Sequence, residues 1–192
     1  MFERDLRTWS FLVGAAATGL SSCRYERHKM TNPHTAHHID GPGDLGQITQ
    51  VLIVGVNASD AGTCAVQTAV HLARQLNAHL RAVHVRDADD TPVDPDNSEW
   101  EADTEDAVAR IRARTLGSLQ QAGWDHWSYR EYYGAAARRI REDADTLDAA
   151  FIVIGVPRRD LLARIGEALG DTVAAQLIHQ ADRPVLSVPA TS

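Results

Sequence analysis

The chain has 192 residues, of which 44% are hydrophobic, and this suffices for one substantial buried core. Its formal net charge of -7 at pH 7 argues against a nucleic-acid or anionic-membrane partner, because either needs a clustered basic face. Its two cysteines, Cys23 and Cys64, lie at unrelated positions and predict neither a disulfide framework nor a zinc site. A cytoplasmic location is therefore expected. No apolar run in the sequence reaches the roughly 18–20 residues that are needed to span a bilayer.

Residues 1–46 differ in composition from the rest of the chain. They are predicted to be a disordered extension, or the product of a start assigned too early, with Met30 as the true first residue. The apolar stretch from Trp9 to Leu20 leads into Cys23 and resembles a bacterial lipoprotein signal, but acidic residues cancel the positive start that such signals need. No membrane partner is expected unless Cys23 is lipidated.

The end of this extension, from Thr31 to Gly46, is rich in proline, glycine, histidine and aspartate, which predicts a flexible tail. His34, His37 and His38 lie within it. Because no cysteine or carboxylate framework accompanies them, they are expected to be solvated and not to bind a metal.

The folded domain is predicted to span residues 47–190. Short apolar runs between turn residues indicate buried strands, and apolar residues at helical spacing indicate helices. Ser59 or Asp60 is expected to cap the first helix. The alternating aromatic residues of 127–133 predict an edge strand exposed on one face. In chain order the pattern predicts strands at 48–56, 80–85, 127–133, 151–155 and 183–189, separated by helices at 62–76, 98–121, from 134 and at 172–180.

This alternation of strands and helices predicts a single doubly wound α/β domain, with a parallel sheet, right-handed crossovers and helices on both faces. The short apolar run Phe151–Gly155 is typical of a buried parallel strand. A glycine at the carboxyl end of a strand, followed by a loop that leads to a helix start, forms a ligand crevice in open α/β sheets. Gly155 and the helix that starts near Thr172 have this arrangement.

Four local patterns resemble the universal stress protein family: Val51–Ser59, Ala69–Val85, Gly134–Ala137 and His179–Pro189. The first is similar to a family strand that ends Gly-Val-Asp-Gly-Ser, and the third stands where the family has Gly-Asp-Pro-Ala. The resemblance implies five parallel strands in the order 3-2-1-4-5, an adenine nucleotide alpha hydrolase-like fold, with a crevice between strands one and four. It also implies a homodimer formed through the last strand, Val185–Val188.

Nucleotide-binding members of the family carry Gly-x2-Gly-x9-Gly followed by Ser or Thr, because glycines let backbone N–H groups approach phosphates. Here Gly155 fits the first position, but Arg158 stands at the second. Gly170 comes two residues late, and Asp171 stands where the hydroxyl residue is expected, with Thr172 one further on. A carboxylate in this position repels a phosphate, so the resemblance implies a degraded ATP-binding loop.

Other residues leave nucleotide binding open. Arg158 and Arg159 are either solvated loop charges or a guanidinium fork that replaces the missing backbone nest. Asn57 takes the place of a family aspartate that helps hold adenine, and an amide can still hydrogen-bond a base edge. The candidate cofactor-binding residues are Asn57, Ser59, Gly134, Gly155, Arg158, Arg159, Gly170 and Thr172.

Two functions follow from the resemblance. The first is a non-catalytic dimeric regulator or partner-binding module in the stress response, with a degraded ATP loop and an unidentified protein partner. The alternative is an ATP- or AMP-dependent switch, with ATP and Mg as the cofactor, that uses Arg158, Arg159 and Thr172. No catalytic residue or metal site is assigned, because no histidine can be placed beside a nucleophile in the crevice. Weak ATP hydrolysis or autophosphorylation is expected only if nucleotide binds.

Overall fold

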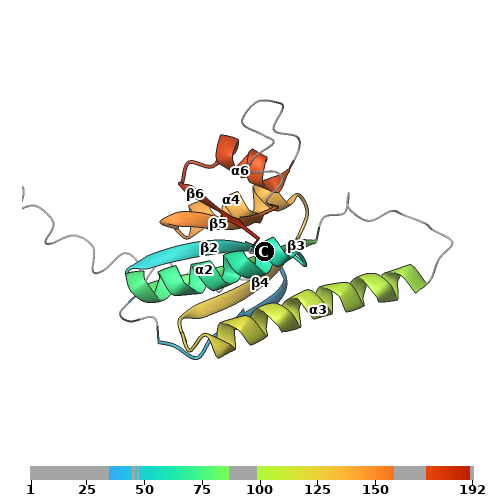
Figure 1. Cartoon of the computed structure of the whole chain (residues 1–192), viewed down its shortest axis with the longest axis horizontal. Helices are drawn as coiled ribbons and strands as arrows, with labels where there is room; N and C mark the ends of the chain where they lie inside the picture. The colour runs from blue at the N-terminus through green and yellow to red at the C-terminus, as the bar shows by residue number, and fades with distance from the viewer. Residues whose placement is uncertain (1–34, 45, 47, 87–98, 158–171, 191–192) are drawn as a thin grey trace, which may run out of the picture.

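A six-stranded sheet with helices on both faces forms the protein (Figure 1). The computed structural model describes residues 35–44, 46, 48–86, 99–157 and 172–190. The strands lie in the order β1-β4-β3-β2-β5-β6, and β1 is antiparallel to β4 whereas the other pairs are parallel. The strands are β1 (Thr35–Asp40), β2 (Gln50–Val56), β3 (Ala78–Arg86), β4 (Trp127–Tyr133), β5 (Phe151–Val156) and β6 (Val185–Pro189).

In the described residues, two helices cover each face of the sheet. Helices α2 (Asp60–Leu76) and α3 (Glu99–Gln121) pack on one face, and α4 (Ala136–Thr146) and α6 (Val173–Gln180) pack on the other (Figure 1). In the parts of the chain that the structure describes, no helix is both long enough and apolar enough to cross a membrane.

Helix α2 shows how the sequence sets these boundaries. Its N-cap is Ser59, whose Oγ accepts a hydrogen bond from the backbone N–H of Gly62 at 3.0 Å, and this satisfies one of the donors left free at a helix start. Asn77 ends the helix in the left-handed conformation, with φ 49°, which asparagine adopts more readily than most residues. Small residues at helical spacing, including Ala65, Ala69 and Ala73, are fully buried against the sheet.

The strands alternate their side chains between two apolar cores. Leu52 and Val54 of β2 face the core under α2 and α3, whereas Ile53 faces the core under α4 and α6. β2 is buried on both faces because it lies at the centre of the sheet, as a continuous apolar run predicts for a parallel strand.

The expectation of five strands, all parallel, is wrong, because the segment Thr35–Asp40 adds an antiparallel strand beside β4. That segment falls within the tail that its composition predicts to be flexible. The expectation that 127–133 is an exposed edge strand is wrong for the same reason: every residue of β4 except Tyr133 is buried. The alternating pattern arises because both faces of β4 carry polar side chains that the fold buries and pairs.

Glu131 is the first of the buried polar side chains of β4. It is completely buried and accepts hydrogen bonds from Arg86 Nε at 2.6 Å, Arg112 Nη2 at 2.9 Å and the Tyr129 hydroxyl at 3.1 Å. Burial acts to raise the pKa of Glu131, but the hydrogen bonds from Arg112 and Arg86 outweigh it and hold the pKa below its usual value. Arg86 also pairs with the exposed Glu105, so this network fastens α3 to the sheet.

A second polar cluster lies on the opposite face of β3 and β4. His79 Nε2 and the Ser128 hydroxyl are 2.7 Å apart, and Arg81 Nη1 lies 3.2 Å from a carboxylate oxygen of Asp143 on α4. Burial lowers the pKa of His79 to about 3, so this ring is neutral at pH 7.

Candidate functional site

A pocket of about 250 Å³ lies at the carboxyl ends of β2, β3 and β5, beneath the first turns of α4 and α6. The strand order changes direction here, since β3 lies on one side of β2 and β5 on the other, and such switch points are where open α/β sheets bind ligands. The pocket is lined by Gly55, Val56, Asn57, Val83, His84, Val85, Ala136, Ile140, Ile154, Gly155, Val173 and Ala174.

Asn57 lies at the end of β2, where its side chain forms a tight local turn. Its Oδ1 accepts hydrogen bonds from the backbone N–H of Ser59 at 3.1 Å and from the Ser59 hydroxyl at 2.7 Å. A backbone N–H can only donate, so the oxygen of the amide must face Ser59. Asn57 can therefore offer a ligand its NH₂ group, which is a hydrogen-bond donor. An aspartate at this position would offer an acceptor instead.

Ser59 has a structural role. Its hydroxyl donates to Asn57 and also accepts from the Gly62 N–H, and Ser59 is not among the residues that line the pocket. Both hydrogen bonds hold the turn between β2 and α2, so Ser59 shapes the pocket wall without reaching a ligand.

Gly155 lies in the pocket lining, and the adjacent backbone explains why it is a glycine. A Cβ at this position would lie 2.3 Å from the carbonyl carbon of Ala61 and 2.5 Å from the backbone nitrogen of Gly62. The end of β5 thus packs directly on the first turn of α2, at a distance that no other residue type allows. This contact accounts for the glycine without any phosphate.

Helix α6 begins at the pocket rim. Thr172 is its N-cap, and the Thr172 hydroxyl accepts from the Ala175 N–H at 3.3 Å. Val173 and Ala174, the first two residues of the helix, line the pocket. The positive end of the α6 dipole therefore faces the pocket, which favours a ligand with a negative charge.

His84 is the titratable residue in the described pocket lining. Its Nδ1 lies 3.0 Å from the carbonyl oxygen of Val56, and because a carbonyl only accepts, Nδ1 carries the proton. Burial lowers the pKa of His84, so the ring is neutral at pH 7. The described lining thus contains no side chain that is charged at neutral pH, and it contains no nucleophile paired with a base.

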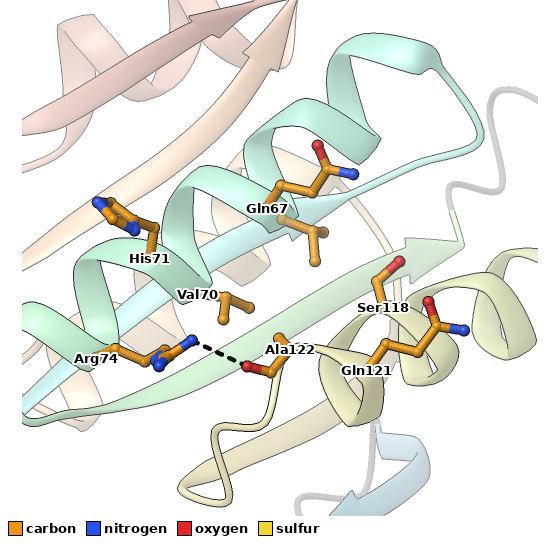
Figure 2. A pocket seen from close by; sticks show the side chains of 8 residues that line it. Gln67, Val70, His71, Arg74, Ser118, Gln121 and Ala122 are labelled. Atoms are coloured by element: carbon orange, nitrogen blue, oxygen red, sulfur yellow. Dashed lines mark hydrogen bonds between the residues drawn. The ribbon is translucent and has the colours of Figure 1, made fainter.

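A second and larger pocket, of about 330 Å³, lies between α2 and α3. Figure 2 shows its polar walls and the hydrogen bond, 3.2 Å long, from Arg74 Nη1 to the carbonyl oxygen of Ala122. None of the residues expected from the sequence to bind a ligand lines it. In the described parts of the chain, no group of three or more histidine, cysteine, aspartate or glutamate side chains is placed to hold a metal ion.

A family model described as the Universal stress protein family matches residues 49–189 of the chain. The chain belongs to this family. No curated protein sequence matches it.

Solved universal stress proteins have a similar fold. One, determined in complex with cAMP, is 23% identical, with a TM-score of 0.55, and the match covers 74% of this chain and 98% of that one. The universal stress protein UspA from Lactobacillus plantarum is 18% identical, with a TM-score of 0.58 and coverage of 73% and 98%. A family protein from Arabidopsis thaliana with AMP bound is 16% identical, with a TM-score of 0.51 and coverage of 74% and 93%. At these identities the likeness shows the fold.

In this universal stress protein the fold brings together some of the candidate residues. Asn57 and Gly155 share the pocket, and Thr172 caps the helix that closes it. Gly134, with φ 116°, sits in the turn before α4, and its N–H donates to the Arg86 carbonyl at 3.0 Å, so it is needed for the turn. Four candidates or flanking residues lie outside the described residues: Arg158, Arg159, Gly170 and Asp171.

Sequence reasoning missed most of the apolar lining. Val83 and Val85 alternate with His84 at the end of β3, and Ala136 and Ile140 lie one turn apart on α4. In the sequence, each of these residues has the pattern of an ordinary core residue. For Val83 and Val85 the available signal was their position at the carboxyl end of β3, because parallel strands bring such ends to one edge of the sheet.

Proposed function

We propose that this universal stress protein is a non-catalytic regulator that binds an adenine nucleotide in the pocket at the ends of β2, β3 and β5. The observation that carries this proposal is the composition of the pocket. Val56, Val83 and Ile154 give it an apolar interior, which suits a flat base, and the amide of Asn57 supplies a hydrogen-bond donor at its edge. Two similar structures, one determined in complex with cAMP and one with AMP bound, support a ligand of this class.

The size of the pocket favours a mononucleotide. Small-molecule pockets usually measure about 300–1,000 Å³, and this one measures about 250 Å³. A base, a sugar and one phosphate at the rim fill such a space better than a complete triphosphate. The phosphate would lie at the start of α6, where the helix dipole and free backbone N–H groups replace charged side chains.

Calorimetry on the purified full chain tests the proposal. The protein is first denatured and the supernatant chromatographed for nucleotides, and the emptied, refolded protein is then titrated with AMP, cAMP and ATP, with and without Mg²⁺. Ala136→Leu, which fills the pocket mouth, should weaken binding at least tenfold. Ala135→Leu, an exposed neighbour outside the lining, is the matched control and should bind normally. No co-purified nucleotide and no heat up to millimolar ligand would refute nucleotide binding.

A second candidate function, pairing of two copies through β6, has its own supporting observation. β6 is an edge of the sheet, and Leu186 on it is 40% exposed. Among the described residues no strand pairs with the outer edge of β6. An open apolar edge strand invites a second strand, and two copies that add edge to edge form a symmetric dimer. Such a dimer could carry the regulatory role by presenting a surface to a protein partner.

Sedimentation analysis separates this candidate from nucleotide binding. Leu186→Lys should convert a dimer to a monomer, because it places a charge in the paired edge. Leu76→Lys, at a similarly exposed leucine at the end of α2, should leave the dimer intact. A wild-type chain that sediments as a monomer at micromolar concentration would rule out β6 pairing while leaving the nucleotide proposal standing.

A further inference from the structure

The pocket between α2 and α3, called here the α2–α3 pocket, takes no part in the proposed nucleotide site. Its lining residues come from the middle and end of α2 and from the end of α3, and none of them lines the pocket at the strand ends. Its volume of about 330 Å³ lies within the range of about 300–1,000 Å³ that is usual for small-molecule pockets. The α2–α3 pocket is therefore large enough for a ligand of its own.

Polar side chains line the α2–α3 pocket where the two helices face each other. They include Gln67 and Arg74 on α2 and Ser118 and Gln121 on α3 (Figure 2). Helices that pack closely on each other normally fill such facing positions with apolar side chains. Here both helices carry polar residues instead, and the space between them stays hollow.

The floor of the α2–α3 pocket is apolar. Val66 and Val70 line it, and both are buried in the core between these helices and the sheet. An apolar floor beneath a polar rim suits a ligand that has an apolar body and a polar group at one end.

The guanidinium of Arg74 is held in place at this pocket. Its Nη1 donates to the carbonyl oxygen of Ala122 at 3.2 Å (Figure 2). The N–H groups of Nε and Nη2 lie along another edge of the guanidinium plane, and such a fork matches the two oxygens of a carboxylate. None of the described residues that line the pocket is an aspartate or a glutamate, so the lining does not supply that carboxylate.

The two helix ends limit the charge that suits this pocket. Arg74 lies in the last turn of α2, and Ala122 directly follows α3. The C-terminal end of a helix carries a partial negative charge, which offsets part of the positive charge of the arginine. A ligand with one negative charge therefore suits the pocket better than a phosphate with two.

We propose that the α2–α3 pocket is a second ligand site, which binds a small organic acid with an apolar body. The carboxylate of the ligand binds the Nε and Nη2 fork of Arg74, and its apolar body lies over Val66 and Val70. This site shares no lining residue with the nucleotide pocket, so the two proposals stand or fail separately.

Titration of the full chain with phenylacetate, followed by two-dimensional NMR, tests this inference. The backbone amide signals of residues 66–74 and 118–122 should shift and reach saturation, with a dissociation constant below about 1 mM. Arg74→Gln removes the charge and the fork at an exposed position, and it should weaken binding by about tenfold or more. Arg138→Gln, the same substitution at an exposed arginine of α4 on the opposite face of the sheet, should bind as the wild type does.

Two related compounds test the chemistry of the ligand. Phenylacetamide has the same apolar body without the charge, and it should bind about tenfold more weakly or less. Phenyl phosphate carries close to two negative charges at pH 7 and should bind no more tightly than phenylacetate; tighter binding would overturn the assignment of a carboxylate.

Three results with phenylacetate would each overturn the proposal, whether or not the chain binds a nucleotide. The first is the absence of any shift up to about 10 mM ligand, ten times the expected dissociation constant. The second is an equal dissociation constant in Arg74→Gln and the wild type. The third is a set of shifts confined to the residues of the pocket at the strand ends, because the acid would then bind in the nucleotide site.

Discussion

Replacement of Gly155 by alanine tests whether this glycine serves packing or a ligand. The new Cβ would lie within 2.5 Å of three backbone atoms of Ala61 and Gly62, and these atoms belong to a helix turn that cannot move alone. Overpacking of a well-packed site costs about 1–3 kcal/mol. Because the clash is with backbone, we expect a value in the upper part of that range, which lowers the melting temperature by roughly 4–12 °C for a domain of this size.

Gly117 provides a control with the same chemical change. It lies inside α3, and a Cβ there would meet no heavy atom within 4 Å. Gly117→Ala should stabilise the chain by about 0.5–1 kcal/mol, because glycine weakens a helix interior. Thermal and urea unfolding of both variants, each without nucleotide, measures the two effects, which should have opposite signs. If Gly155→Ala unfolds at the wild-type temperature and instead loses nucleotide binding, the packing explanation is wrong and the glycine serves the ligand.

Two further predictions concern buried ionisable groups. Glu131→Gln should destabilise the chain by about 3–5 kcal/mol in urea unfolding, because it leaves Arg86 and Arg112 without their buried carboxylate. Glu105→Gln, at the exposed end of the same network, should have only a small effect. Equal effects of the two substitutions on the free energy of unfolding would contradict the burial argument. Stability should fall as the pH drops from 7 to 5, because the unfolded chain protonates His79 near its ordinary pKa of 6.5 while the folded chain holds that pKa at about 3, a loss of roughly 2 kcal/mol over this range. His79→Gln should remove that part of the pH dependence, and a variant with the wild-type slope would show that another group causes it.

Most strands and helices could be predicted because their sequence patterns are local. The apolar run in β2, the spaced alanines of α2 and the Ser59 cap each follow from contacts within a few residues. The polarity of β4 was misleading for a physical reason. Its buried charges are paired by residues distant in sequence, with Arg112 on α3 and Asp40 on β1, and no local pattern reveals such pairing.

The candidate site was predictable only in part. The ends of β2 and β5 mark the crevice, so Asn57 and Gly155 could be placed there from the sequence. The reason why position 155 is a glycine could not be predicted, because it depends on how closely β5 approaches α2. Which side-chain atom of Asn57 faces the ligand could likewise not be predicted, because the orientation of its amide depends on one hydrogen bond from the backbone N–H of Ser59.

Strand β1 has a consequence for synthesis on the ribosome. Asp40 and its partner Arg130 are 90 residues apart in the chain, so β1 emerges long before β4 exists. At about 5–20 residues per second, this strand waits roughly 5–20 s for its partner. Its sequence suits that wait, because His37, His38 and Asp40 keep it polar and poorly suited to self-association. The same residues that complete the folded sheet thus protect the nascent chain while the sheet is still being made.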